Sequence, residues 1–270
     1  MKRTFSLSFL TVADVGPVEA IQIAAHAGYD AIGLRLLPAA PATEAPYPLL
    51  TDTALLTEVQ AALRDTGITV ADVEIVRLGE QVEVQSYLPF LERAQQLGAK
   101  HILIAGDDTN EARLTENFTR FAELAQSFQL TCDLEFMPWT GVKNLTAARR
   151  VVEGSGVSNA GILIDSLHFF RTESSFEALR ELPLNFINYV QLCDAPALYD
   201  PSDEGLIYVA RNARLVPGEG QLDLKRLMQF IPSSKPIGIE VPNTRLLQTM
   251  SAQKRATYML ERTIELLREC

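Results

Sequence analysis

The sequence predicts a single (β/α)8 TIM barrel, a fold of the α/β class. One recurring unit leads to this prediction: an amphipathic helix, a glycine that ends it, and a short apolar stretch. The unit is seen in HAGYDAIGLRL, DTGITVADVEIV, QLGAKHILIAG and SGVSNAGILID. Glycine ends a helix at the least steric cost because it adopts the left-handed conformation freely. This alternation is typical of parallel strands joined by helices, and 270 residues suit one barrel.

The elements follow in chain order. Eight apolar or β-branched stretches are the expected strands, at residues 4–9, 31–36, 68–76, 101–105, 130–136, 161–165, 187–193 and 236–241. The expected helices are the amphipathic stretches at 17–27, 52–66, 85–98, 111–128, 144–154, 175–181, 222–230 and 251–268. No composition shift divides the chain, so we expect one domain over residues 1–270. An open doubly wound sheet is the alternative, but no GxGxxG turn follows the first strand.

Two connections are longer than the others. One runs from Pro38 to Leu50 after the second strand, and the other from Asp194 to Gln221 after the seventh. Long loops at the C-terminal face of a barrel usually build or cover the functional site. We therefore expect both connections to border the site, with Asp194 and Glu219 either supporting the site residues from behind or ordering the second connection.

The composition limits the class of partner. A net charge of −10 repels a phosphate backbone, and no cluster of Lys and Arg with aromatic residues appears, so nucleic acid is not expected. No apolar stretch approaches the roughly 20 residues of a membrane helix, so no membrane association is expected. The N-terminal stretch MKRTFSLSFLTVAD is interpreted as the first strand, not as a signal peptide. The scattered Cys132, Cys193 and Cys270 favour reduced thiols and a cytoplasmic protein.

Polar side chains interrupt the apolar ends of four expected strands. Strand five ends in DLEFMPW with Glu135, strand six in ILIDSLHFF with Asp165 and His168, strand seven in YVQLCDAP with Gln191, and strand eight in PIGIEVPN with Glu240. The C-terminal ends of barrel strands meet at one mouth, so these groups are expected to converge there.

Three buried carboxylates at one mouth repel one another unless a positive charge lies among them. A divalent metal is the simplest solution, and a mostly oxygen ligand set favours Mn²⁺ or Mg²⁺. The alternative is a structural network in which arginines compensate the acids; the candidates are Arg35, Arg77, Arg171 and Arg214.

The chain resembles the xylose-isomerase-like TIM barrels, the sugar phosphate isomerase/epimerase superfamily. The resemblance covers essentially the whole chain, and its most specific segments are LEFMPW, GILIDSLHFFR, YVQLCDAP, RLVPGEGQLDL and IGIEV, in the expected order. It implies the metal ligands Glu135, Asp165, Gln191 and Glu240. It also implies substrate contacts by His168 and Arg214, a small sugar or polyhydroxylated carbonyl substrate, and a homo-oligomer.

Two positions depart from the pattern of the resembled sugar epimerases. Most of them have histidine where this chain has Gln191, and the set Glu, Asp, Gln, Glu is similar to that of the 3-dehydroshikimate dehydratases of the same superfamily. Ketose epimerases often carry a glutamate where this chain has Gly141. A dehydratase-like lyase is therefore an alternative to an isomerase or epimerase.

Both reactions begin with removal of a carbon-bound proton next to a carbonyl, which a metal assists as a Lewis acid. We expect Glu135 and Glu240 to act as paired acid and base, and His168 to be the base in a dehydratase. Arg214 is expected to bind a hydroxyl, carboxylate or phosphate of the substrate, and Trp139 to wall the pocket with some substrate contact. A non-catalytic, metabolite-binding barrel remains the second alternative.

Overall fold

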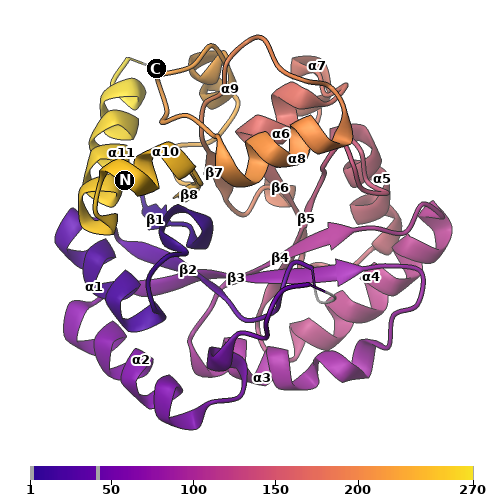
Figure 1. Cartoon of the computed structure of the whole chain (residues 1–270). Helices are drawn as coiled ribbons and strands as arrows, with labels where there is room; N and C mark the ends of the chain where they lie inside the picture. The colour runs from indigo at the N-terminus through magenta and orange to yellow at the C-terminus, as the bar shows by residue number, and fades with distance from the viewer. Residues whose placement is uncertain (1–2, 41–42, 270) are drawn as a thin grey trace.

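The computed structural model describes residues 3–40 and 43–269. It contains a closed barrel of eight parallel strands, in which each strand pairs with the next along the chain and β1 pairs with β8. The strands are β1 Phe5–Leu7, β2 Ala31–Arg35, β3 Thr69–Leu78, β4 His101–Gly106, β5 Thr131–Glu135, β6 Ala160–Asp165, β7 Val190–Leu192 and β8 Ile237–Ile239. Figure 1 shows the helices arranged around the strands. The single TIM barrel is confirmed, and the open sheet is excluded.

The α-helices lie where the sequence predicts them, with three additions. They are α1 Pro17–Ala27, α2 Thr53–Thr66, α3 Leu88–Gln96, α4 Glu111–Gln126, α5 Leu145–Ser155, α6 Ser166–Arg171, α7 Phe176–Arg180, α8 Asp203–Asn212, α9 Leu224–Gln229, α10 Thr244–Thr249 and α11 Ala252–Leu267. Helices α6, α8 and α10 are additions, and each is capped by a side chain that accepts a backbone N–H: Asp165, Ser202 and Asn243. Such caps satisfy donors that the first helical turn leaves free.

Three strands, β1, β7 and β8, are at least three residues shorter than expected. The predicted strand 4–9 ends at Leu7, because residues Phe9–Val12 form a 3-10 turn. Thr11 holds this turn against β8 by donating its hydroxyl to the carbonyl of Ile239 at 2.8 Å. The seventh and eighth strands keep only their central residues, and the connection after β7 contains α8 where the sequence suggested only a long loop.

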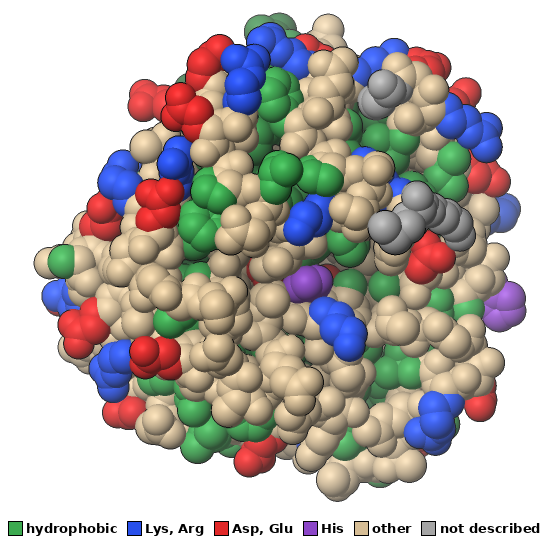
Figure 2. Space-filling model, turned by 180° about the vertical axis from the view of Figure 1, so that it is seen from behind, with side chains coloured by type: hydrophobic (Ala, Val, Ile, Leu, Met, Phe, Trp, Pro, Cys, Tyr) green, Lys and Arg blue, Asp and Glu red, His purple; other side chains and the backbone are tan. Residues whose placement is uncertain are grey.

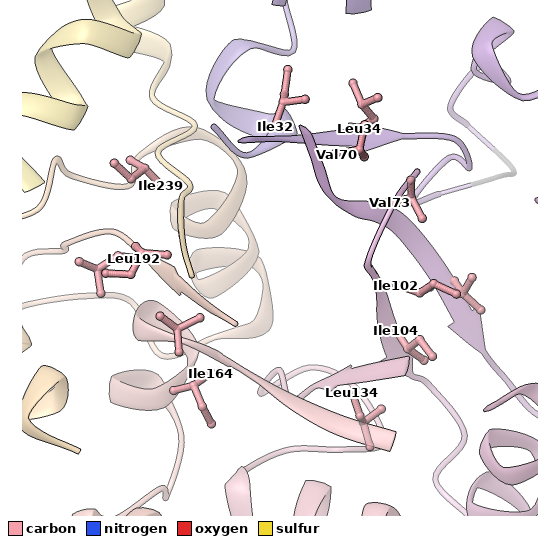
Figure 3. Close-up of a cluster of buried hydrophobic side chains, with 14 of the residues drawn as sticks. Ile32, Leu34, Val70, Val73, Ile102, Ile104, Leu134, Ile164, Leu192 and Ile239 are labelled. Carbon is pink, nitrogen blue, oxygen red and sulfur yellow. The ribbon is translucent and has the colours of Figure 1, made fainter. Parts of the chain in front are cut away.

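Two apolar clusters hold the barrel. The larger one fills the layer between the strands and the surrounding helices. Figure 3 shows its strand residues, among them Ile32, Val73 and Ile164, pointing away from the barrel centre. The smaller one lies on inward-facing positions and is formed by Ile75, Leu103, Ala105, Met137, Leu163 and Tyr189. Inward and outward residues alternate along each strand, so the two clusters are separate cores.

The outer surface carries charges of both signs. Figure 2 shows the molecule from behind the view of Figure 1, with acidic and basic side chains interspersed around the rim and a histidine in a central hollow. In the described part of the chain, none of the helices is long and apolar enough to cross a membrane.

Candidate active site

A pocket of about 370 Å³ opens at the C-terminal ends of the strands. Its walls include five predicted site residues: Glu135, Trp139, His168, Arg214 and Glu240. The other two, Asp165 and Gln191, are fully buried and lie opposite each other on β6 and β7. The structure therefore gathers at one mouth the groups that the sequence scatters over more than one hundred residues.

Asp165 ends β6 and begins α6. One of its oxygens accepts the backbone N–H of His168 at 3.1 Å, so the same carboxylate fixes the start of the helix and the position of the histidine. The imidazole Nε2 lies 3.8 Å from the carboxylate of Glu135. Ligand atoms of Glu135, Asp165 and His168 all lie within 4.8 Å of one another.

Arg214 lies between two of the predicted acids. Its guanidinium donates to Asp165 at 2.5 Å and contacts the carboxylate of Glu240 at 3.0 Å. Gln191 donates its amide N–H to the other oxygen of Glu240 at 3.2 Å. Arg214 thus bridges Asp165 and Glu240, and Gln191 joins this hydrogen-bonded group through Glu240.

Burial and charge shift the pKa of these groups in different directions. Burial raises the pKa of Glu135 well above its ordinary value, and the neighbouring Asp165 and Glu240 raise it further. Burial also raises the pKa of Glu240 to about 8, against the attraction of Arg214. For Asp165, burial acts upward, but Arg214 and His168 outweigh it and lower the pKa. Burial lowers the pKa of His168 to about 4, so the imidazole is neutral at pH 7.

The donor set fits a divalent cation. The amide oxygen of Gln191 is buried and accepts no hydrogen bond from any described residue, and Nδ1 of His168 is likewise without a partner there. Three carboxylates, an amide oxygen and an imidazole are ligands that Mn²⁺, Mg²⁺ and Zn²⁺ accept in different proportions. His168 joins Glu135 and Asp165 in the tightest group, whereas the sequence assigned it to the substrate.

The arginine network that the sequence left open exists in part. Arg214 compensates two of the site acids, but the other arginines have different partners. Arg35 pairs with Glu74, Arg77 with Asp107, and Arg171 donates to the carbonyl of Pro196.

Sequence reasoning missed one wall of the pocket. Arg35, Glu44, Glu74 and Arg77 line it, from β2, β3 and the connection between them. Arg35 and Glu74 are almost fully buried and form a salt bridge. The signal was present, since Glu74 interrupts the apolar stretch ADVEIVRL in the same way that Glu135 interrupts its strand.

Three further positions shape the mouth. Trp139 contacts His168 edge to face, with ring centroids 5.1 Å apart. Gly141 has no room for a side chain, because a Cβ there would lie 2.2 Å from the carbonyl oxygen of Asp108. Asp194 orders the connection after β7, as expected, by accepting the backbone N–H groups of Gly218 and Leu222, each at 3.0 Å.

A family model described as xylose isomerase-like TIM barrel matches residues 21–270. The chain belongs to this family. Curated relatives are distant. A 3-dehydroshikimate dehydratase of Pseudomonas aeruginosa is 28% identical over 158 residues, which are 55% of this chain and 24% of the relative. An inosose isomerase of Bacillus velezensis is 24% identical over 153 residues, 52% of each chain. The chain therefore spans about a quarter and about half of the lengths of these two relatives.

Solved structures of the family share the fold at low identity. The crystal structure of IOLI protein with a bound zinc atom has a TM-score of 0.81 at 17% identity and covers 98% of both chains. A D-allulose 3-epimerase from Methylomonas sp., in complex with D-allulose, has a TM-score of 0.70 at 15% identity and covers 98% of this chain and 97% of the epimerase. At these identities the likeness shows the fold alone.

Proposed function

We propose that the chain is a divalent-metal-dependent isomerase or epimerase that moves a proton on the carbon next to a carbonyl of a sugar-like substrate. One observation carries the proposal: the carboxylates of Glu135 and Asp165, two of the proposed ligands, lie within 4.8 Å of each other and of the His168 imidazole, beside a pocket of about 370 Å³. The zinc-bound IOLI structure supports a divalent metal, and the inosose isomerase of Bacillus velezensis supports an isomerase activity.

Glu135, Asp165, Gln191 and Glu240 are the proposed ligands. When bound, the ion supplies a Lewis acid that polarises the substrate carbonyl. The mostly oxygen set favours Mn²⁺ or Mg²⁺, although the IOLI structure holds zinc.

The residues at the barrel mouth have separate roles in the proposed reaction. Glu135 and Glu240 come from β5 and the end of β8 and both line the pocket, so one can remove a proton while the other returns one to the opposite side of the substrate. Arg214 holds Asp165 and Glu240 in place. Trp139 limits the access of water to the histidine side of the pocket.

A dehydratase of the 3-dehydroshikimate type is the second candidate. The match to the Pseudomonas aeruginosa dehydratase favours it, and so does a neutral, buried His168 at the pocket wall, which suits a base. In this reaction His168 removes the proton, and the hydroxyl leaves from the neighbouring carbon.

Proton exchange distinguishes these activities from simple binding. Mn²⁺-loaded protein is incubated in D₂O with inosose, with D-allulose or with 3-dehydroshikimate, and NMR follows loss of the carbon-bound proton. We expect exchange with one of the first two and its loss in Glu135→Gln, while the exposed control Glu123→Gln retains it. Conversion of 3-dehydroshikimate to a dehydrated product would replace the proposal by the second candidate. Binding without exchange would identify a non-catalytic barrel.

A further inference from the structure

The interior of the barrel is divided into an apolar half and a polar half. The inner cluster around Leu103, Met137 and Leu163 fills the side formed by β3 to β7. On the side of β1, β2 and β8, the inward positions include Ser6, Ser8, Gly33 and Gly238, above which Arg35 lines the pocket. Bulky branched residues usually fill these layers of a TIM barrel. In the polar half, small residues thus leave the interior to polar side chains of the same and neighbouring strands.

Two glycines on the neighbouring strands flank Ser6 of β1 and Ser8 just after it, and polar atoms lie over both glycines. Gly33 on β2 pairs with Asp72 on β3, and a Cβ at Gly33 would lie 3.0 Å from each carboxylate oxygen of Asp72. Gly238 on β8 pairs with Ser6, and a Cβ there would lie 2.7 Å from the hydroxyl of Ser8. The carboxylate of Asp72 thus lies over β2, and the hydroxyl of Ser8 lies over β8, on either side of β1.

The side-chain oxygens of Asp72, Ser6 and Ser8 are buried and have no hydrogen-bond partner among the described residues. They comprise both carboxylate oxygens of Asp72 and the hydroxyls of Ser6 and Ser8. Each of the three residues is at most 1% exposed. Buried polar groups in proteins are almost always satisfied, and an unpaired buried carboxylate is among the costliest to leave alone. A ligand that is small enough for a closed interior is therefore expected here.

The neighbouring acids have direct partners, but Asp72 has none among the described residues. Glu74 pairs with Arg35, and Asp165 and Glu240 share Arg214. Asp133 accepts hydrogen bonds from Thr131 at 2.6 Å and from Asn188 at 2.8 Å. Asp72 makes no ion pair or hydrogen bond with a described residue. Burial raises the pKa of Asp72, the neighbouring Glu74, Glu240 and Asp133 raise it further, and Arg35 acts against them. A cation bound beside Asp72 would offset this repulsion and keep the carboxylate ionised, whereas a neutral ligand would not.

We propose that Asp72, Ser6 and Ser8 bind a monovalent cation, Na⁺ or K⁺, inside the barrel below the pocket. One carboxylate balances one positive charge, and hydroxyl and carboxylate oxygens are hard ligands that suit an alkali cation. Gln191 belongs to the divalent site and is not needed here. The inference does not depend on the proposed reaction, because a structural cation stabilises an enzyme and a binding protein alike.

Thermal melting of the Mn²⁺-loaded protein in NaCl, KCl and N-methyl-D-glucamine chloride at equal ionic strength tests the proposal. We expect the melting temperature to be about 2–4 °C higher in one or both alkali salts than in the bulky organic salt. Asp72→Asn removes this difference. Asp133→Asn, a control with an equally buried acid in the same barrel, retains it. Equal melting in all three salts, or an undiminished difference in Asp72→Asn, would contradict the proposal.

A second measurement does not depend on the folding of a variant. Thallium(I) replaces K⁺ and scatters X-rays anomalously, so crystals of the unaltered protein soaked in thallium(I) acetate should show a peak between Asp72 and the two serines. Ordered water alone at this position, or a protonated Asp72 with no peak, would overturn the inference. A thallium peak would support it even if no substrate were turned over.

Discussion

Asp165 uses its two oxygens for two different partners: one accepts the backbone N–H of His168 at 3.1 Å, and the other accepts a hydrogen bond from Arg214 at 2.5 Å. The first bond begins a helix, and the second brings a positive charge among three carboxylates. Arg214 is only 2% exposed, so its charge is screened little by water. In the absence of a metal ion, Arg214 is the main compensation for Asp165 and Glu240.

Arg214→Met is therefore expected to destabilise the metal-free protein by about 3–5 kcal/mol, because it leaves two buried carboxylates uncompensated. A bound divalent ion supplies the missing charge, so the loss should shrink when Mn²⁺ is added. Urea unfolding with and without Mn²⁺ measures both values. Arg211→Met, a change at an exposed arginine three residues earlier, should alter stability by less than about 0.5 kcal/mol. An equal loss for Arg214→Met in both conditions would show that no ion replaces the arginine.

His168→Gln separates a ligand role from a substrate role. We assign His168 to the substrate because it lies on the pocket wall beside Trp139, although it also lies close to Glu135 and Asp165. We expect the variant to keep most of its stabilisation by Mn²⁺ and to lose proton exchange by about 10²-fold or more. Calorimetric titration with Mn²⁺ provides the first value and D₂O exchange the second. A variant that no longer binds Mn²⁺ would make His168 a ligand, in line with its place beside Glu135 and Asp165.

The far end of the barrel should show opposing effects of pH. Burial lowers the pKa of His101 to about 4, with Lys235 and Lys100 acting in the same direction. Burial raises the pKa of Asp133 to about 7, against its hydrogen bonds to Thr131 and Asn188. Between pH 6.5 and 4 the imidazole of His101 is protonated in the unfolded state but stays neutral in the folded state. His101 therefore lowers the free energy of unfolding as the pH falls from 6.5 to 4. Between pH 7 and 3.8 the folded state binds the Asp133 proton more tightly, so Asp133 raises stability as pH falls.

Variants that remove one of these two groups should show its contribution to the pH dependence of stability. His101→Gln is expected to gain stability relative to the unaltered protein between pH 6.5 and 4, and Asp133→Asn to lose it between pH 7 and 4, each by on the order of 2 kcal/mol. Urea unfolding at a series of pH values measures the slopes. Parallel slopes for both variants would mean that neither group titrates as its burial requires.

Gly141 is expected to tolerate no side chain. A Cβ would lie 2.2 Å from the backbone oxygen of Asp108, and a backbone atom cannot yield as a flexible side chain does. Gly141→Ala should destabilise the protein by about 1–3 kcal/mol. Gly79→Ala is the matched control, since its Cβ would meet no atom within 4 Å. If Gly141→Ala melts like Gly79→Ala, steric exclusion does not explain the absence of the epimerase glutamate at this position.

The fold and the floor of the site could be predicted from the sequence, because both depend on local patterns. The helix, glycine and strand unit repeats often enough to indicate the barrel, and acids that interrupt apolar strands indicated Glu135 and Glu240. The wall formed by Arg35 and Glu74 could not be assigned as readily, because a salt bridge across neighbouring strands depends on register. Helix α8 was missed because only Leu206 and Ala210 of its ten residues are buried, so its sequence carries a weak apolar pattern.

The most direct test of the central claim is thermal melting of metal-stripped protein with and without Mn²⁺, for the unaltered chain, Glu135→Gln and the exposed control Glu123→Gln. We predict that Mn²⁺ raises the melting temperature of the unaltered chain and of Glu123→Gln by about 4 °C or more, and that Glu135→Gln loses most of this shift. A melting temperature that does not respond to Mn²⁺, Mg²⁺ or Zn²⁺ in the unaltered chain would contradict a divalent metal centre at the barrel mouth.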